Sequence, residues 1–322
     1  MAQFEGFAHV ELEPASIDAS FRRYFRVQKD AESFIVMDAP PPQEDCRPFV
    51  QIAGYLEAMG LNCPRVLGAD LENGFVLMSD LGAIRYIDQL QQDADRANAL
   101  YSDAIDALLT LQRKGDAYQQ QLPTYDYDFI SLELSIFRDW LCGRHLGIDF
   151  TNEEEKHWQD CCEFLIDNAL RQKQVFMHRD FHSRNLMVMP ENNPGILDFQ
   201  DAVEGPISYD VVSLFKDCYI KWPADQIETW ALEYYARLDA ELKNGISDRE
   251  FLDRFHLMGV QRHLKAAGIF ARLNHRDDKP GYLADIPRTL EYICDTAPQY
   301  PELNFLTDLV SKRVVTAIRE DS

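Results

Sequence analysis

Histidine, carboxylate and amide side chains gather in one short stretch of the chain, "HRDFHSRNLMVMPENNPGILDF", at residues 178–199. Such groups bind metals, transfer protons or cap turns. Asp180 lies five residues before Asn185, and Asp198 lies 13 residues after it. Two carboxylates and one amide oxygen form a ligand set that suits Mg²⁺, which completes its shell with water and phosphate oxygens.

A short hairpin is expected to position these side chains. We expect "NLMVM" and "ILDF" to be paired strands, joined by the turn "PENNPG" and centred between Asn192 and Asn193. This centre places Asn185 opposite about residue 200, with Asp198 diagonal to it at the open end. Neighbours across such a pair lie about 5–8 Å apart, near enough for two oxygens to share a cation.

The order of these residues is that of a catalytic loop followed by a metal-binding loop in phosphoryl-transfer enzymes. Transfer to an alcohol needs charge neutralisation, positioning and a proton acceptor. The pattern predicts Asp180 as the general base and Asn185 and Asp198 as Mg²⁺ ligands. The structural alternative is that each residue merely caps a turn. We favour a loop-supporting role for His178 and His182, a helix N-cap for Asp210, and leave Asp201 open between metal and surface.

The elements before this stretch indicate a small β-rich region. Hairpins are predicted in "SFRRYFRVQKDAESFIVMDAP", with "KDAE" as the turn, and in "PRVLGADLENGFVLMSDLG", with "ENG" as the turn. Between them, "RPFVQIAGYLEAMG" reads as an amphipathic helix closed by Gly60. Beyond Gly82 the periodicity is mostly helical, for example in "ADRANALYSDAIDALLTLQRKG" and "DREFLDRFHLMGVQRHLKAAGIFARL". We therefore predict an α+β fold with a nucleotide-binding lobe at residues 1–79 and a helical lobe with the catalytic loop and substrate pocket at residues 80–322.

Several segments carry a family resemblance. "HRDFHSRNLMV" and "ILDFQDAVEGPISYD" resemble the aminoglycoside phosphotransferase and choline kinase superfamily, relatives of the protein kinases. "ASFRRYFRV", "FIVMDAPP", "FVLMSDLG" and "HLKAAGIFARL" resemble the bacterial anomeric N-acetylmuramate/N-acetylglucosamine kinases, and the likeness covers nearly the whole chain. The resemblance implies a two-lobe protein-kinase-like fold, ATP and Mg²⁺ as cofactors, and phosphorylation of the C1 hydroxyl of a free amino sugar in cell-wall recycling.

The resemblance also assigns site residues. It makes Asp180 the general base, makes Asn185 and Asp198 the metal ligands, and places an adenine-facing hinge around Leu77, Met78, Ser79, Asp80 and Leu81. The resemblance also implies that Asp210 supports the catalytic loop, which agrees with a structural role. Arg179 and Gln200 stand where the family often has other residues, but neither replaces a ligand.

The larger departure is a missing lysine. Kinases generally hold the nucleotide phosphates with a lysine on the third strand, whereas "FIVMDAP" has Met37 and Asp38. No GxGxxG is present either, so we expect Arg23 or Arg26, in the first hairpin, to contact the phosphates. The alternative is that these arginines only mark a charged strand edge.

The composition of the chain limits the kinds of binding partner that we expect. The net charge of −22 leaves no basic footprint for nucleic acid. No secretory signal and no membrane span are expected. The seven cysteines show no paired CxxC spacing, which favours free thiols in a reducing cytoplasm. The chain suggests a small-molecule substrate and no obligate protein partner.

Other functions stay open from the sequence. The acceptor could be an aminoglycoside, choline or homoserine, and the missing lysine would suit a nucleotide-binding pseudokinase scaffold. Arg262, His263 and Lys265 interrupt an apolar helix, which is either core with polar tips or the wall of a sugar pocket.

Overall fold

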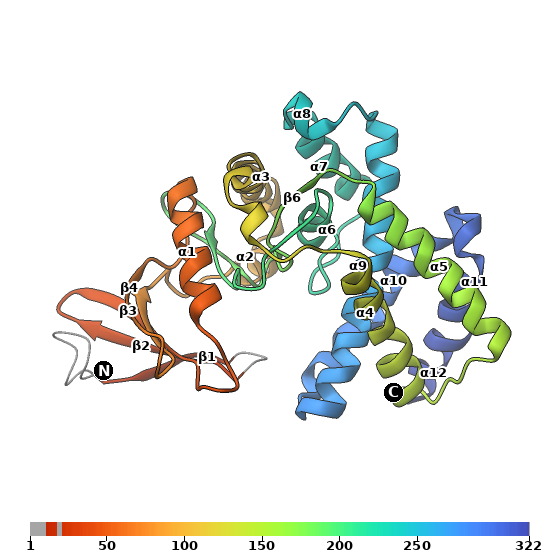
Figure 1. The fold of residues 1–322 in the computed structure, drawn as a ribbon, viewed down its shortest axis with the longest axis horizontal. Coiled ribbons are helices and arrows are strands. Elements are labelled where there is room, and N and C mark those ends of the chain that lie inside the picture. The colour runs from red at the N-terminus through yellow and green to blue at the C-terminus, as the bar shows by residue number, and fades with distance from the viewer. Residues whose placement is uncertain (1–10, 18–20, 322) are drawn as a thin grey trace. The chain divides into compact units, whose positions relative to one another are not determined.

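The computed structural model of the chain describes residues 11–17 and 21–321. It divides into two compact units (Figure 1). The first comprises the described part of Met1–Tyr118 together with Arg184–Ala202, and the second comprises Gln119–Ser183 with the described part of Val203–Ser322. The expected boundary after residue 79 therefore falls inside the first unit. The assignment of nucleotide and acceptor binding to separate lobes stays a prediction.

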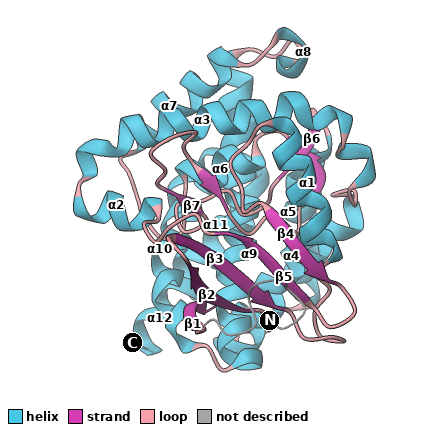
Figure 2. Ribbon diagram, turned by 90° about the vertical axis from the view of Figure 1, so that its left-hand side faces the viewer, coloured by secondary structure: helices cyan, strands magenta, loops and turns pink. Residues whose placement is uncertain are grey.

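The first unit is built on a five-stranded antiparallel sheet in the order β1-β2-β3-β5-β4 (Figure 2). The strands are β1 Glu13–Ile17, β2 Arg23–Lys29, β3 Glu32–Asp38, β4 Val66–Asp70 and β5 Phe75–Ser79. Both predicted hairpins are confirmed. β1 was not predicted, since "EPASI" contains a proline and has no apolar alternation.

Apolar residues from three neighbouring strands form one face of this sheet. Val27, Val36 and Leu77 are buried together, with Phe34 packed against them. Lys29 pairs with Glu32, so Asp30 and Ala31 form the turn between β2 and β3, as predicted. The backbone of Asp30 is left-handed, with φ 56°, which aspartate tolerates better than most residues.

Helices and a further hairpin also belong to the first unit. They are α1 Arg47–Met59, α2 Tyr86–Gln92, α3 Ala97–Lys114, β7 Leu186–Met187 and β8 Gly195–Ile196. Gly60 ends α1 as predicted, in a left-handed conformation at φ 79°. Lys114 donates to the carbonyl of Met59 at 2.6 Å, which ties the end of α3 to the end of α1.

The second unit is mostly helical. Its helices are α4 Tyr127–Ile136 with a π-helical continuation at Phe137–His145, α5 Asn152–Leu170, α6 Tyr209–Phe215, α7 Ala224–Arg237, α8 Ala240–Lys243, α9 Asp248–Asp277, α10 Ile286–Thr296, α11 Asn304–Asp308 and α12 Val315–Asp321. The predicted long helix is α9, which packs against α4, α5, α6, α7 and α10 (Figure 1). β6 Gln174–Met177 and β9 Val203–Pro206 pair antiparallel. Within the described residues, no helix combines the length and apolar character that crossing a membrane requires.

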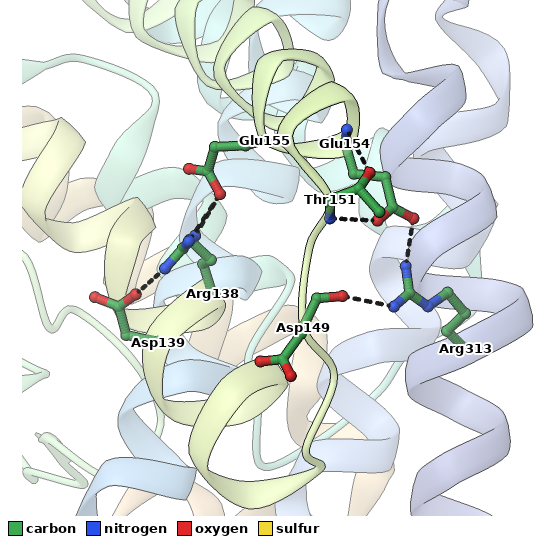
Figure 3. Close-up of polar contacts among 7 residues, drawn as sticks. All are labelled: Arg138, Asp139, Asp149, Thr151, Glu154, Glu155 and Arg313. Carbon is green, nitrogen blue, oxygen red and sulfur yellow. Dashed lines mark hydrogen bonds and ion pairs between the residues drawn. The ribbon is translucent and has the colours of Figure 1, made fainter.

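Polar contacts fix the start of α5 (Figure 3). Glu154 N–H donates to the Thr151 hydroxyl at 3.2 Å, and Thr151 N–H donates to the Glu154 carboxylate at 2.8 Å, forming a capping box. Arg313 donates to the same carboxylate at 2.7 Å. Arg138 pairs with Glu155 at 2.8 Å. These bonds attach α5 to its neighbours in the same unit.

Candidate active site

The loop that carries Asp180 follows β6 in the second unit, and buried acceptors hold it. Asp210 accepts the backbone N–H of His178 at 2.7 Å and that of Arg179 at 2.9 Å. The predicted N-cap position of Asp210 is wrong, because α6 has Ser208 at its N-cap. The loop-supporting role that the family resemblance implied for Asp210 is confirmed by these two hydrogen bonds. Arg179 has φ 77°, a conformation that side chains rarely adopt and that must be stabilised by its surroundings.

A second carboxylate holds the far end of this loop. Asp217 accepts hydrogen bonds from both the backbone N–H and the hydroxyl of Ser183, and also from the N–H of Tyr219 at 2.8 Å. His178 accepts the Asp180 N–H at 3.2 Å, which confirms the expected loop-supporting role of this histidine. The backbone on both sides of Asp180 is thus fixed by side chains.

A buried ion network lies beside the loop. Glu133 on α4 pairs with Arg179 at 2.6 Å and with Lys265 on α9 at 3.1 Å, and it accepts the Tyr125 hydroxyl. Lys265 also donates to the Tyr209 hydroxyl at 3.0 Å. Burial would raise the pKa of Glu133, but the charges of Lys265 and Arg179 outweigh it and lower that pKa below its usual value.

Asp180 lines a pocket in the second unit whose empty volume is about 430 Å³. Its other lining residues are His182, Tyr209, Cys218, Tyr219, Arg262, Lys265, Ala266, Ile269 and Phe270. Burial alone would raise the pKa of Asp180. The positive charges of Lys265, His182, Arg179 and Arg262 more than offset this, so the pKa lies well below the usual carboxyl range. Asp180 is therefore an ionised, partly exposed carboxylate facing an open pocket.

The other two predicted ligands lie together in the first unit, on the β7–β8 hairpin. Leu186 pairs with Ile196, so Asn185 stands opposite Leu197, and its carbonyl accepts the Leu197 N–H at 2.9 Å. The Asn185 amide donates to Asp198 Oδ2 at 3.1 Å. The predicted proximity of Asn185 and Asp198 is confirmed. The predicted register, with residue 200 opposite Asn185, is wrong.

The turn explains the error in register. The Asn193 side chain accepts the Met189 N–H at 2.9 Å and donates to Asp103 on α3 at 2.7 Å. These bonds hold the turn closer to β7 than the sequence suggested. The paired strands are consequently only two residues long.

The Asn185–Asp198 pair has the composition of a Mg²⁺ site. Asp198 has φ 62°, a left-handed backbone that aspartate tolerates better than most residues. Its other carboxylate oxygen accepts from Gln200 at 2.8 Å. In the described part of the chain, no three His, Cys, Asp or Glu side chains gather as a metal cluster. A carboxylate with one amide oxygen fits Mg²⁺, which retains waters and takes phosphate oxygens, better than an ion enclosed by protein.

The predicted phosphate-binding arginines are both paired within the first unit. Arg23 forms an ion pair with Asp38, and its side chain is 65% exposed. Arg26 donates to both oxygens of Asp80, at 2.6 and 3.0 Å, and to the Gly82 carbonyl at 2.9 Å. The structure thus gives Arg26 a structural partner that the sequence did not suggest. A phosphate contact of either arginine stays a prediction.

The predicted hinge lies at the end of β5. Leu77 and Met78 are buried, and the Ser79 hydroxyl accepts the Arg65 N–H at 2.8 Å. Burial would raise the pKa of Asp80, but hydrogen bonds from Arg26, Ser33 and Gly82 lower it. The Arg26–Asp80 pair therefore joins β2 to the segment after β5, and adenine binding there stays a prediction.

Sequence reasoning missed Glu133 and Asp217, which support the loop without belonging to the motif. A single glutamate in the apolar stretch "ISLELSIF" was a signal for Glu133, because a charged side chain on a buried helix face needs a partner. Asp217 gave no comparable signal. Asp180 belongs to the second unit, whereas Asn185 and Asp198 belong to the first.

Comparison with known proteins adds independent information. Residues 11–247 match the profile of the phosphotransferase enzyme family. A protein of Pseudomonas aeruginosa named N-acetylmuramate/N-acetylglucosamine kinase is 47% identical over 311 residues, covering 95% of this chain and 90% of its own. A protein of the same name from Neisseria meningitidis is 39% identical over 300 residues, covering 91% and 87%.

Solved structures agree on the fold. Choline kinase LicA from Streptococcus pneumoniae matches with a TM-score of 0.63 at 12% identity, covering 91% of this chain and 97% of its own. The GDP complex of wild-type aminoglycoside 2'-phosphotransferase-IIIa matches with a TM-score of 0.62 at 16% identity, covering 93% and 97%. The predicted kinase-like α+β fold and family resemblance are confirmed. Because the profile matches residues 11–247 and the relatives are up to 47% identical over most of the chain, the chain belongs to the phosphotransferase enzyme family.

Proposed function

We propose that this phosphotransferase moves the γ-phosphoryl group of ATP to the anomeric hydroxyl of N-acetylmuramate or N-acetylglucosamine. The observation that carries the proposal is the identity of 47% over 95% of the chain to a kinase named for these two sugars. An ionised Asp180 at the wall of a pocket of about 430 Å³ supports the same activity.

The pocket lining distinguishes this acceptor from the rivals. Arg262 and Lys265 line it together with Asp180. Two buried cations oppose the binding of a cationic acceptor such as an aminoglycoside or choline. A neutral or acidic sugar is not repelled by these two cations. The apolar wall formed by Ile269 and Phe270 also suits a sugar ring with an acetyl group.

Asp180 acts as the general base. As the anomeric oxygen attacks the γ-phosphorus, its proton passes to the Asp180 carboxylate, the bond from the γ-phosphorus to the bridging oxygen breaks, and ADP leaves. An anomeric hydroxyl is more acidic than an ordinary alcohol, so a carboxylate with a low pKa is adequate. Asp210 and Asp217 keep the loop in place for this step through their bonds to His178, Arg179 and Ser183.

Asn185 and Asp198 hold Mg²⁺, which when bound neutralises charge on the phosphates. Arg23 adds a positive charge in place of the missing third-strand lysine. The seven free thiols support a reducing, cytoplasmic location.

Phosphorus NMR of the products tests the function directly. The enzyme is incubated with ATP and, separately, with N-acetylmuramate, N-acetylglucosamine, choline and an aminoglycoside. A sugar 1-phosphate resonance from the amino sugars alone is expected. Phosphorylation of choline or the aminoglycoside, or phosphate on another sugar hydroxyl, would overturn the assignment. Nucleotide binding without transfer to any acceptor would indicate a scaffold instead.

A further inference from the structure

Two buried cations on α9 face the acceptor pocket. Arg262 and Lys265 both line it, and they are 5% and 8% exposed. Residues three apart on a helix lie on the same side, so the two side chains reach the pocket from one helical face. Charged groups are rarely buried to this degree without compensating partners.

The hydrogen bonds of Arg262 use few of its N–H donors. Among the described residues, its hydrogen-bond acceptor is the Cys218 thiol, at 3.5 Å. A thiol is a weak acceptor, whereas a guanidinium carries five N–H donors in a planar fork. Lys265 uses donors toward Glu133 and the Tyr209 hydroxyl, at 3.1 and 3.0 Å. Arg262 therefore retains donors that an oxygen-rich ligand in the pocket can satisfy.

The other α9 residues that line the pocket are apolar. Ala266, Ile269 and Phe270 line the same pocket one and two turns further along the helix. The ring centroids of Phe270 and Tyr219, another lining residue, lie 6.1 Å apart. The pocket wall thus runs from a cationic end to an apolar and aromatic end, with Asp180 also facing in. A ligand with an anionic substituent on an otherwise weakly polar body matches this arrangement.

We infer that Arg262, assisted by Lys265, forms a carboxylate-binding subsite for the acceptor. The inference rests on the proposed function and deepens it. The two proposed sugars differ in that N-acetylmuramate carries a lactyl ether ending in a carboxylate, which N-acetylglucosamine lacks. The planar fork of Arg262 can hold both oxygens of such a carboxylate. Arg262 is then the residue through which the enzyme distinguishes the acid from the neutral sugar.

The test pairs a change in the protein with a change in the ligand. We expect Arg262→Gln to lower kcat/KM for N-acetylmuramate by about 10- to 100-fold, the loss that follows removal of a charged hydrogen bond. For N-acetylglucosamine the loss should be smaller, because only the effect of the Arg262 charge on Asp180 remains. Wild type should favour N-acetylmuramate over its methyl ester, and Arg262→Gln should lose that preference. Arg262→Lys, which keeps the charge without the fork, should recover part of it.

Arg276→Gln is the matched control, because Arg276 lies on the same helix with a side chain that is 54% exposed, paired with Asp277 outside the pocket lining. It should leave the kinetics with both sugars unchanged. An equal loss of kcat with both sugars in Arg262→Gln would overturn the inference and indicate a contact with the transferred phosphoryl group. Equal kcat/KM of the wild type for N-acetylmuramate and its methyl ester would also overturn the inference, even where the variant fails to fold. Wild type inactive on both sugars would instead refute the proposed function.

Discussion

The side-chain amide of Asn185 donates to Asp198 Oδ2 across 3.1 Å, joining the two residues proposed to hold Mg²⁺. The backbone N–H of Leu197 donates a hydrogen bond to the Asn185 carbonyl, so the hairpin backbone fixes this proximity. The amide nitrogen faces the carboxylate. Rotation of the amide group would present its oxygen as a metal ligand instead.

Asp198→Ala and Asp180→Asn should separate metal binding from base catalysis. Asp198→Ala removes a metal ligand, so we expect loss of both MgATP affinity and turnover. Asp180→Asn removes the base and leaves both metal ligands, so turnover should fall by about 10²- to 10⁴-fold with MgATP affinity largely retained. Calorimetry of MgATP binding and a coupled assay measure the two effects.

The control for this pair is Glu191→Gln, which removes an exposed carboxylate from the turn of the same hairpin. It should bind MgATP like wild type. Equal losses of nucleotide affinity in the Asp180 and Asp198 variants would contradict the assigned roles.

Arg23→Ala tests the substitute for the third-strand lysine. Arg23 is mostly exposed, whereas Arg26 is engaged by Asp80, so Arg23 can be removed with less disturbance of the sheet. We expect MgATP affinity to weaken by about 5- to 10-fold, corresponding to the loss of about 1 kcal/mol from one hydrogen bond. Arg47→Ala, at an equally exposed arginine of the same unit, should have no effect. Unchanged calorimetric affinity in Arg23→Ala would leave Arg23 as a surface ion pair only.

The pH dependence of the reaction should respond to Lys265. Burial raises the pKa of Asp180, and the Lys265 charge is the largest of the positive charges that together outweigh it. Asp180 works ionised, so kcat/KM should fall only as the pH drops below the usual carboxyl range. Lys265→Met raises that pKa and should move the acid limb to higher pH. The profile is measured with N-acetylglucosamine, so that loss of a carboxylate contact does not contribute.

Lys221→Met provides the comparison, since Lys221 is also paired with acids but lies outside the pocket lining. Its acid limb should coincide with that of wild type. An unmoved limb in Lys265→Met would mean that Asp180 does not set the acid side of the profile.

The contrast between local and distant partners explains what the sequence could predict. Asn185 and Asp198 are 13 residues apart in one hairpin, so their proximity followed from the motif even though the register was wrong. Glu133 meets Lys265 across 132 positions, and Arg26 meets Asp80 across 54. No periodicity encodes such pairs, because they depend on how whole elements pack. Phosphate binding was accordingly predicted for Arg23 or Arg26 without knowledge of the Arg26–Asp80 pair, and it stays a prediction.

Glu133→Ala should destabilise the protein strongly. It leaves Arg179 and Lys265 without their buried carboxylate, and breaking a buried ion pair costs about 3–5 kcal/mol of unfolding free energy. Because the folded-state pKa of Glu133 is lowered, its contribution is present above the ordinary carboxyl pKa and is lost as pH falls through the folded value. Urea unfolding at pH 7 and at pH 4 measures both effects.

Glu155→Gln gives the reference for an ion pair that is not buried. Glu155 pairs with Arg138, and the two side chains are 31% and 40% exposed (Figure 3). Such pairs contribute about 0–1 kcal/mol, so this variant should unfold close to wild type. A similarly small loss in Glu133→Ala would show that the Glu133 network does not stabilise the fold.

Lys216 should make the stability of the protein rise with pH in a range in which most lysines do not change their protonation state. Its amine is buried, 2.9 Å from His256 Nδ1, and burial lowers its pKa to about 7. The unfolded chain keeps this lysine protonated up to about pH 10.4, so between these values it binds more protons than the folded state. Wild type should gain stability relative to Lys216→Met by up to about 1.4 kcal/mol per pH unit from pH 7 to 10.

The difference between wild type and Lys216→Met isolates this effect, because cysteines and tyrosines that titrate in the same range are common to both proteins. Urea unfolding at pH 7, 8 and 9 measures it, with Lys221→Met as the control at a lysine whose pKa is raised by hydrogen bonds to Glu291 and Asp295. The control should differ from wild type by the same amount at each pH. A constant difference for Lys216→Met as well would mean that Lys216 stays charged in the folded protein, with His256 accepting its proton as a hydrogen bond.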